Sequence, residues 1–381
     1  MSVFTDHEKE HYSRHLSLTG FGEDRQILLK QSRVLLVGAG GLGCPAGLYL
    51  AASGVGKIGV IDFDTVERSN LQRQIAHSVH DLHRSKVDSL IDSMQSVNPW
   101  ITYSGYRNKL AVDNIEQILP EYDLILDGSD NFSTRFLLTD ACYLMKKPLI
   151  QAAVFETEGQ LSFCLPGHGP CYRCLFESRP KGEALPNCSD IGVLSVLPGT
   201  MGLLMATEAI KFITGWGETL EKKFIRYNAL TSSMKTYHNV NNPDCPLCGN
   251  NPKIQNLNSY QQTMDSSFCG ESITLSIAQL LSMESLQPVF LDVRSQAEYE
   301  RLHKPGAIHC PLDNLSQEKT KKLLSELPEK TIIITYCQKG LRSLQAAQML
   351  KTWGWDRVFS LDGGLNQLSE TEKSWFLDTA L

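Results

Sequence analysis

A glycine-rich stretch, GAGGLG, has a spacing that suits phosphate binding. It follows the apolar run Val34–Val37 and precedes a segment with helical periodicity. In this context backbone amides can approach a phosphate at a helix N-terminus. Asp62 ends the next apolar run, about 20 residues further on, where a carboxylate can accept hydrogen bonds from ribose hydroxyls. The stretch therefore predicts a nucleotide site. Its glycines are Gly38, Gly40, Gly41 and Gly43.

The residues that follow favour a polyphosphate over a nicotinamide cofactor. The segment SNLQRQ places Asn70 and Arg73 just after the second apolar run, and Lys86 comes next. Two cations and an amide near a nucleotide indicate chemistry at phosphates. Asp130, in DGSDN after another apolar run, is a suitable Mg²⁺ ligand. The alternative for Arg73 and Lys86 is that they are solvated surface charges.

A second chemical stretch, CQKGLRS, starts at Cys337 after the apolar run 331–336. A free cysteine thiol has a pKa of ~8.5, so only a few per cent is ionised at pH 7. Inward-pointing loop amides that lead into a helix N-terminus favour the thiolate, and Lys339 and Arg342 add positive charge. The stretch predicts a thiol that accepts sulfur and holds it as a persulfide. The alternative is an ordinary cysteine at the end of a strand.

Four further cysteines form two C-x-x-C pairs, in PCYRC and DCPLCG. Paired knuckles of this kind suit a tetrahedral structural zinc ion, since four thiolates leave no open position for water. The alternative is four ordinary reduced cysteines. His77, His80 and His83 recur at every third position and could form a metal face, but a solvated helix or loop is the preferred interpretation. The predicted zinc ligands are Cys171, Cys174, Cys245 and Cys248.

Strand and helix patterns alternate along most of the chain, which predicts α/β domains with mostly parallel sheets and ligands at the strand C-termini. We expect one domain over 1–249 and a smaller α/β domain over 272–381. Residues 250–271 are rich in Asn, Gln and Ser and predict a linker. About 20 flexible residues would span roughly 25 Å and give a millimolar effective concentration between the domains.

Composition is that of a globular protein. The 381 residues are 42% hydrophobic and 20% charged, and the net charge of −6 disfavours nucleic acid as the main partner. The run Val193–Ala206 is interrupted by Pro198, Gly199 and Gly202, so we expect it to be too short to span a membrane. Eleven cysteines with no export signal at the N-terminus predict a reducing, cytoplasmic location.

The motifs together resemble known families. RxLxLxGFG (Arg14–Gly22), VGAGGLGCPAG, DFDTVExSNLQRQ, DGSDN, PCYRCLF and CPLCG match the molybdopterin-synthase adenylyltransferase and ThiF-type family, relatives of ubiquitin-activating enzymes, from about His11 to Gly249. From about Ile273 onward, DVRSQAEYERLHKPGAIHCPL, CQKGLRS and LDGG resemble a rhodanese domain. Together the two parts are similar to fused adenylyltransferase–sulfurtransferase proteins, which implies a Rossmann-like, doubly wound sheet with a zinc knuckle followed by a rhodanese domain.

The resemblance also implies roles for individual residues. Arg14 matches an arginine that reaches the partner subunit's nucleotide site, which implies a homodimer. Cys188, in LPNCSDIGV, matches a thiol on a mobile crossover loop. Asp292 and Arg294 match the rhodanese DxR motif and are expected to support the fold. The positions that match the ATP and Mg²⁺ site are Gly41, Asp62, Ser69, Asn70, Arg73, Lys86, Asp130 and Asn131.

The implied reaction joins both domains. The first would use ATP to adenylate the C-terminal glycine of a small ubiquitin-like sulfur carrier ending in diglycine, with Arg14, Arg73, Lys86 and Mg²⁺ stabilising phosphate charge. The Cys337 persulfide, loaded by a cysteine desulfurase or thiosulfate, would then yield the carrier thiocarboxylate with help from Cys188. The alternatives are an adenylating enzyme acting on a peptide or tRNA base, an NAD-dependent oxidoreductase, and a non-catalytic binding module.

Overall fold

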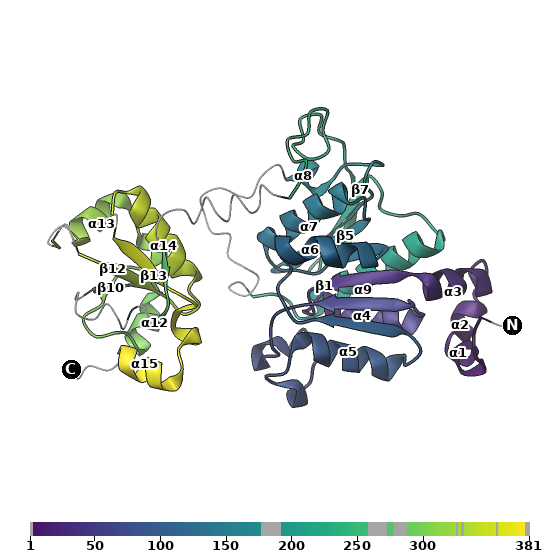
Figure 1. Ribbon diagram of the computed structural model, residues 1–381, viewed down its shortest axis with the longest axis horizontal. Helices are drawn as coiled ribbons and strands as arrows, with labels where there is room; N and C mark the ends of the chain where they lie inside the picture. Colours follow the sequence, from purple (N-terminus) through teal and green to yellow (C-terminus); the bar gives the residue numbers. More distant parts are fainter. Residues whose placement is uncertain are drawn as a thin grey trace. The chain divides into compact units, whose positions relative to one another are not determined.

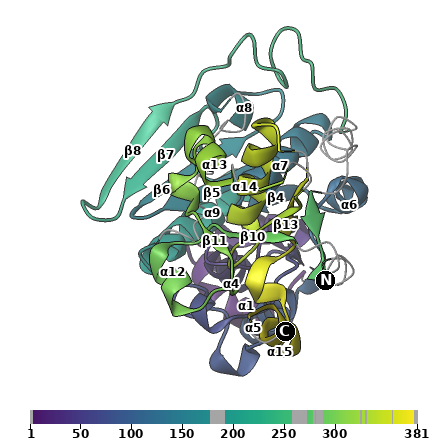
Figure 2. The same ribbon diagram turned by 90° about the vertical axis from the view of Figure 1, so that its left-hand side faces the viewer.

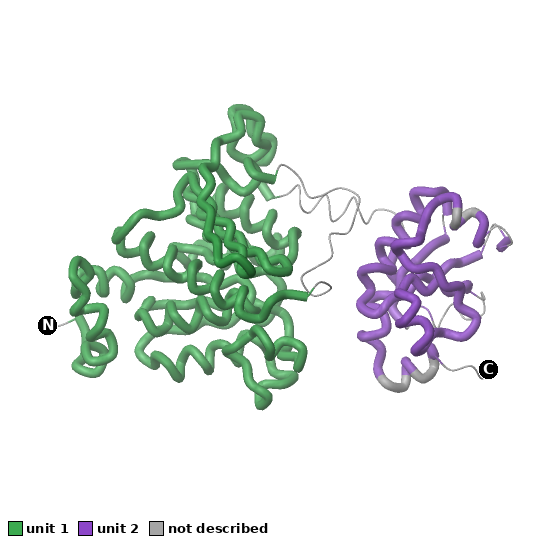
Figure 3. The backbone as a smooth tube through the Cα atoms, turned by 180° about the vertical axis from the view of Figure 1, so that it is seen from behind, with its two compact units in different colours: residues 1–263 green, residues 264–381 purple. Residues whose placement is uncertain are grey.

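The structure is a computed structural model that describes residues 3–176, 192–257, 273–277, 280, 288–324, 327–328, 331–355 and 357–377. The chain divides into two units, Met1–Thr263 and Met264–Leu381 (Figure 3). The boundary between them falls inside the stretch 250–271 that the sequence predicts as a linker. The beginning of that stretch belongs to the core of unit 1, because Leu257 is buried in the same hydrophobic core as Cys171 and Cys245.

Unit 1 is built on a mixed sheet of strand order β3-β2-β1-β4-β5-β6-β7-β8. Figure 2 shows β5, β6, β7 and β8 side by side. The five strands β1 to β5 are parallel, and β6, β7 and β8 are antiparallel to their neighbours. The strands are β1 (Arg33–Val37), β2 (Lys57–Ile61), β3 (Thr102–Tyr106), β4 (Leu124–Asp127), β5 (Leu149–Phe155), β6 (Glu158–Cys164), β7 (Lys223–Asn228) and β8 (Ser233–His238).

Helices cover both faces of this sheet (Figure 1). Strand β1 shows why: Val34 and Leu36 lie in the core under α4, α5 and α9, whereas Leu35 and Val37 lie in the core under α6 and α7. Side chains alternate between faces along a strand, so a strand apolar at successive positions must be buried on both sides. The helices are α1 (Asp6–His11), α2 (Ser13–Leu16), α3 (Gly22–Gln31), α4 (Gly43–Ser53), α5 (Lys86–Val97), α6 (Val112–Ile118), α7 (Phe132–Leu144), α8 (Tyr172–Leu175) and α9 (Val196–Thr214).

Helix α9 is longer than the sequence predicts. Pro198 lies in its first turn, where a missing N–H is tolerated, so the proline does not interrupt it. Gly202 allows close packing on α4, because a Cβ there would lie 2.5 Å from the carbonyl oxygen of Leu42. With 19 residues, α9 is the one helix in the described ranges long and apolar enough to cross a membrane, by length and composition alone. Its buried side chains, among them Met201 and Met205, join the core of unit 1.

Unit 2 has a second, smaller parallel sheet of order β11-β10-β12-β13-β9. Cores lie on both faces of this sheet as well: Leu350 of α14 packs on one side and Phe376 of α15 on the other. The strands are β9 (Thr274–Leu275), β10 (Val289–Asp292), β11 (Ile308–His309), β12 (Ile333–Tyr336) and β13 (Val358–Leu361). The described helices are α12 (Gln296–Arg301), α13 (Gln317–Leu324), α14 (Leu341–Thr352) and α15 (Glu370–Leu377).

Candidate functional site

The glycine loop connects β1 to α4, as the sequence predicts. Gly38 has a φ of 95°, a left-handed conformation that favours glycine. A Cβ on Gly43 would lie 1.9 Å from the carbonyl oxygen of Gly38, so a side chain there would open the turn. The loop is also tied to the next strand, because the Ala39 N–H donates a hydrogen bond to Asp62 Oδ2 at 2.8 Å. This arrangement keeps the loop backbone at the start of α4.

Acidic and basic side chains meet beside the loop. Asp62 accepts a second hydrogen bond, from the Asp64 N–H at 2.9 Å. Burial raises the pKa of the Asp62 carboxyl, while the Lys86 ammonium opposes that rise. Lys86 Nζ lies 2.7 Å from Asp64 Oδ2, and only 8% of the lysine side chain is exposed. The predicted solvated alternative for Lys86 is therefore wrong. Asp64, which sequence reasoning did not select, holds this cation in place.

In the SNLQRQ segment, some side chains shape the local turn and one lines the cleft. Asn70 is buried, and its Oδ1 accepts a hydrogen bond from the Glu67 N–H at 3.0 Å. Ser69 Oγ donates to Glu67 Oε2 at 3.2 Å. Arg73 lies in the cleft described below and donates through Nη1 to the Ser69 carbonyl oxygen at 3.0 Å. Asn70 and Ser69 thus shape the turn that carries Arg73, and neither lines the cleft itself.

The end of β4 supplies another acidic group. Asp127 is fully buried and accepts hydrogen bonds from Ser129 and Gln151. This leaves Asp130, three residues further along the loop, exposed in the cleft. Asn131 caps α7, since its Oδ1 accepts a hydrogen bond from the Thr134 N–H at 2.9 Å.

A cleft of about 480 Å³ joins these groups. This volume is within the range of small-molecule sites. Of the predicted ATP-binding residues, those that line the cleft are Gly38, Gly40, Gly41, Asp62, Arg73, Lys86, Asp130 and Asn131. Arg14 is exposed on α2 and does not line the cleft. Cys188 lies outside the described residues.

The cleft continues over the antiparallel strands, where sequence reasoning found no site residues. A neighbouring cavity of about 240 Å³ shares side chains with it. The shared residues include Arg135 on α7, Gln160 on β6 and Arg226 on β7. Arg226 pairs with Glu158, and buried Arg135 donates to the carbonyl oxygens of Ser129 and Ala152. No sequence motif indicates these residues, because they lie on three separate segments that only the fold brings together. They form a polar extension suited to a second substrate beside a nucleotide.

The histidine series does not form a metal face. His77 is buried under the glycine loop, where its Nε2 lies 3.0 Å from the Ala39 carbonyl oxygen and its Nδ1 lies 2.8 Å from Ser89 Oγ. The preferred interpretation, solvation, is wrong for His77 and correct for the exposed His80 and His83. Through its contact with Ala39, the buried His77 therefore helps to hold the backbone of the glycine loop in place.

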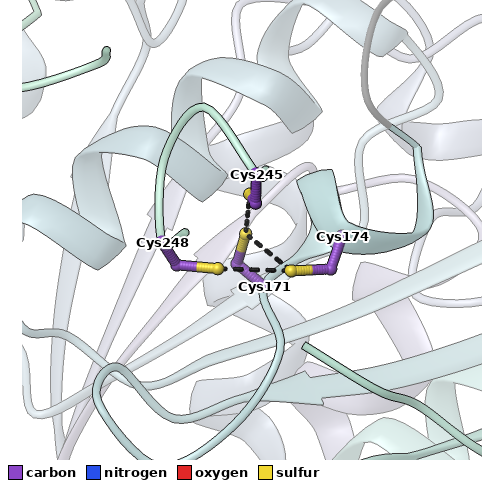
Figure 4. Close-up of side chains that lie close together, drawn as sticks. All are labelled: Cys171, Cys174, Cys245 and Cys248. Carbon is purple, nitrogen blue, oxygen red and sulfur yellow. Dashed lines mark hydrogen bonds between the residues drawn. The ribbon is translucent and has the colours of Figure 1, made fainter. Parts of the chain in front are cut away.

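The four knuckle cysteines meet as predicted (Figure 4). Their Sγ atoms all lie within 4.8 Å of one another, with contacts of 4.0, 3.6 and 3.2 Å. Tetrahedral Zn–S bonds of ~2.3 Å place sulfurs about 3.8 Å apart, which fits this cluster. Hydrogen bonding from Cys171 lowers the pKa of Cys248, whereas burial raises the pKa of Cys174. All four thiols can be ionised together only around a cation, so the cluster indicates a metal site.

In unit 2, Cys337 follows β12 and lies in a loop that enters α14. Its thiol is 1% exposed and accepts a hydrogen bond from the Ser343 N–H at 3.4 Å. Gly340 has a φ of 82°, and a Cβ on Gly364 would lie 2.4 Å from the Cys337 carbonyl oxygen. The diglycine at Gly363 therefore lies directly against the cysteine loop.

The charges of this loop differ from the sequence prediction. Arg342 is paired with Glu298 through two hydrogen bonds of 2.8 and 2.7 Å. These bonds lower the pKa of the Glu298 carboxyl to about 2. Lys339 remains exposed. Because its charge is offset by Glu298, Arg342 contributes less positive potential to the thiol than predicted.

The two DxR residues are buried together at the end of β10. Arg294 donates to both carboxylate oxygens of Asp292, and its Nη2 also donates to the Leu302 carbonyl oxygen at 2.6 Å. The two side chains form hydrogen bonds with each other and with the backbone. This is the arrangement expected of residues that support the fold.

Comparison with known proteins agrees with this geometry. The ThiF family matches residues 12–247, and the rhodanese-like domain matches residues 276–371. The probable adenylyltransferase/sulfurtransferase MoeZ of Mycobacterium tuberculosis is 38% identical over 96% of this chain and 93% of that protein. The adenylyltransferase and sulfurtransferase MOCS3 of Drosophila yakuba is 37% identical over 95% of this chain and 83% of that protein.

Among solved structures, Escherichia coli MccB with AMPCPP and MccA matches with a TM-score of 0.58 and 24% identity, over 65% of this chain and 76% of that chain. At this identity the match shows a shared fold. The sequence matches extend further, since they cover both units with their glycine loop, cysteine knuckles and cysteine loop. The chain therefore belongs to the ThiF family and carries a rhodanese-like domain in its C-terminal part.

Proposed function

We propose that this protein is an adenylyltransferase and sulfurtransferase that converts the C-terminal glycine of a small ubiquitin-like sulfur carrier to a thiocarboxylate. The observation that carries the proposal is the lining of the unit 1 cleft. It combines a glycine loop with two cations, Arg73 and Lys86, and an exposed carboxylate, Asp130. Binding of a nicotinamide cofactor does not require two cations and an exposed carboxylate beside the glycine loop. Nucleotidyl transfer from a triphosphate does, because negative charge develops on the phosphates. Similarity to MoeZ and MOCS3 along both units supports the same function.

In the first step, the carrier carboxylate attacks the α-phosphate of ATP. The P–O bond to the β-phosphate breaks, giving a carrier acyl-adenylate and pyrophosphate. Arg73 and Lys86 would stabilise the charge that develops on the phosphates. Asp130 would hold Mg²⁺, which supplies further charge neutralisation when bound. The neighbouring cavity over β6 and β7, which Arg226 and Gln160 line, would receive the carrier tail.

In the second step, the outer sulfur of a Cys337 persulfide attacks the acyl carbon and AMP leaves. The product is an acyl disulfide that joins the carrier to Cys337. The Cys188 thiolate then attacks Cys337 Sγ, which releases the carrier thiocarboxylate and leaves a disulfide between the two cysteines. A cellular dithiol supplies the two electrons that restore both thiols. Cysteine desulfurase persulfide or thiosulfate would supply the sulfur.

The proposed quaternary structure rests on the family resemblance of Arg14, and the proposed location rests on the reduced cysteines. We propose a cytoplasmic homodimer in which Arg14, exposed on α2, completes the nucleotide site of the partner subunit. An exposed arginine outside its own cleft is suited to this role, because a second copy can reach it.

The function is tested with the full-length protein, ATP, Mg²⁺, thiosulfate and a diglycine-ended carrier identified by co-purification. We expect pyrophosphate release that requires the carrier, and a carrier mass increase of about 16 Da as one oxygen is replaced by sulfur. An unchanged carrier with no pyrophosphate release would refute the proposal. Reduction of NAD by the protein would instead support the oxidoreductase alternative.

We propose that the metal of the cysteine cluster is structural zinc, bound at one ion per chain. Elemental analysis of the wild-type protein should find it. Cys248→Ser removes one thiolate, so we expect a metal content well below one and a melting temperature lower by about 5 °C or more. The matched control is Cys164→Ala, a buried cysteine of β6 outside the cluster, which should lower stability but retain the metal. Full metal content in Cys248→Ser would contradict the assignment.

A further inference from the structure

Ser343, in the first turn of α14, contacts the sulfur of Cys337 with two donors. Its backbone N–H lies 3.4 Å from Sγ, and its Oγ lies 3.5 Å from the same atom. The Ser343 side chain is fully buried. The proposed function uses the cysteine but assigns nothing to this hydroxyl.

The hydroxyl of Ser343 has one proton and two acceptors within reach. The Gly340 carbonyl oxygen lies 3.0 Å from Ser343 Oγ, closer than Cys337 Sγ. Ser360, fully buried on β13, donates its own proton to Ser343 Oγ at 2.9 Å. The direction of that bond leaves Ser343 free to donate to either acceptor. Hydrogen bonds to charged acceptors are the stronger ones, so the charge on Sγ decides which acceptor wins.

We propose that Ser343 is a charge-responsive donor: it donates to Cys337 Sγ when that sulfur is a thiolate and to the Gly340 carbonyl oxygen when the charge has moved away. Ser360 is a positioning residue that holds the Ser343 hydroxyl in the donating orientation. The inference deepens the proposed function and rests on it, since it concerns the sulfur-accepting state of Cys337.

The charge on Sγ changes during sulfur uptake. The Cys337 thiolate attacks the sulfane sulfur of thiosulfate, a new S–S bond forms, and sulfite leaves with the electron pair of the broken bond. The negative charge of the protein then lies on the outer sulfur of the persulfide, and Sγ becomes neutral. Ser343 is therefore expected to stabilise the thiolate before uptake and to contribute less once the persulfide has formed.

Other charged and titratable groups lie on the elements packed around the loop and are unchanged in the variants below. They therefore cancel when variant and wild-type profiles are compared. These groups are Lys339 and Arg342 on the loop and α14, Glu298 on α12, Asp292 and Arg294 at β10, Tyr336 on β12, His309 and Cys310 at β11, and Asp362 after β13.

The test measures alkylation of Cys337 by iodoacetamide against pH in the full-length protein, with the Cys337 peptide quantified by mass spectrometry. In Ser343→Ala we expect the midpoint of the pH–rate profile to rise by about one pH unit. A less stabilised thiolate is also more nucleophilic, with a Brønsted slope of about 0.4–0.5. The variant should therefore react about three- to fourfold more slowly below both midpoints and about threefold faster above them. The two profiles should cross.

Three further variants separate this role from packing. Ser360→Ala should shift the midpoint in the same direction by less, and adding it to Ser343→Ala should cause no further shift, because Ser360 acts through Ser343. Ser343→Thr keeps a hydroxyl and should stay close to the wild-type midpoint. Thr335→Val is the matched control: this buried hydroxyl lies 2.8 Å from the Ser343 carbonyl oxygen and does not contact Sγ, so its loss should leave the midpoint in place.

Parallel profiles for Ser343→Ala and wild type, with no crossing, would overturn the inference. If Ser343→Ala does not fold, an unshifted midpoint in Ser360→Ala overturns it instead. The proposed function is judged separately, by loading the wild-type protein with thiosulfate and looking for about 32 Da of added sulfur on the Cys337 peptide. If the alkylation profiles cross but no sulfur is added to Cys337, the role of Ser343 is retained and the sulfurtransferase function is refuted. If sulfur is added to Cys337 but the profiles are parallel, the sulfurtransferase function is retained and the role of Ser343 is refuted.

Discussion

Replacing Cys337 with alanine should abolish formation of the carrier thiocarboxylate while carrier-dependent ATP–pyrophosphate exchange continues at the wild-type rate. The loss should reach on the order of a thousandfold or more, because the variant has no atom that can store the transferred sulfur. Exchange should persist because adenylation is proposed for unit 1, and the described residues that line the cleft all belong to that unit. Intact mass spectrometry of the carrier measures the first quantity, and exchange of labelled pyrophosphate into ATP measures the second.

Two other cysteines provide comparisons for this prediction. Cys310 is buried in the same core as Cys337, and Cys310→Ser should keep sulfur transfer. Cys188→Ala should slow transfer without abolishing it when an external thiol cleaves the acyl disulfide in its place. If Cys337→Ala forms thiocarboxylate at the wild-type rate with the same donor, Cys337 does not carry the sulfur.

Replacing Asp130 with alanine should reduce ATP–pyrophosphate exchange by about a hundredfold or more. The exposed carboxylate is the group proposed to hold Mg²⁺ in the cleft, and without it the charge on the departing pyrophosphate is less well neutralised. Arg73→Ala should cause a loss of similar size for a related reason, since Arg73 lines the same cleft and carries a positive charge. Both variants should still take up sulfur at Cys337, because that step belongs to unit 2.

The matched control is Asp123→Ala. This carboxylate pairs with Arg33 at the opposite end of the strands, where the two side chains are 44% and 48% exposed. Exposed pairs contribute little to stability, so exchange should remain at the wild-type rate. Full exchange in both Asp130→Ala and Arg73→Ala would show that the cleft is not an adenylation site. A loss of exchange in Asp123→Ala as well would point to a general effect on folding.

The sequence by itself determined the features that depend on local spacing. Gly38 and Gly43 could be recognised because a strand, a glycine turn and a helix follow one another within a few residues. Cys337 could be recognised for the same reason in unit 2. The four knuckle cysteines were predicted to meet although they come from two distant segments. Their C-x-x-C spacing allowed this, since each pair is a preformed half of a tetrahedral site.

Tertiary structure alone decided which polar side chains face the cleft. Asn70 and Arg73 are neighbours in sequence, yet Asn70 turns inward to cap a turn while Arg73 lines the cleft. Arg342 was predicted to add charge at Cys337 but pairs with Glu298, whose helix the fold brings alongside. The direction of a charged side chain is set by partners from other elements.

Tertiary structure also decided which residues meet over the antiparallel strands and which hydroxyls meet beside Cys337. Arg135, Gln160 and Arg226 come from three elements that carry no shared motif, and the mixed sheet brings them to one groove. Ser343 and Ser360 meet because β13 lies next to β12, on which the helix bearing Ser343 packs. Contacts between distant segments depend on sheet order, and sheet order is set by the burial of apolar faces across the whole unit rather than by the spacing of residues within any single segment.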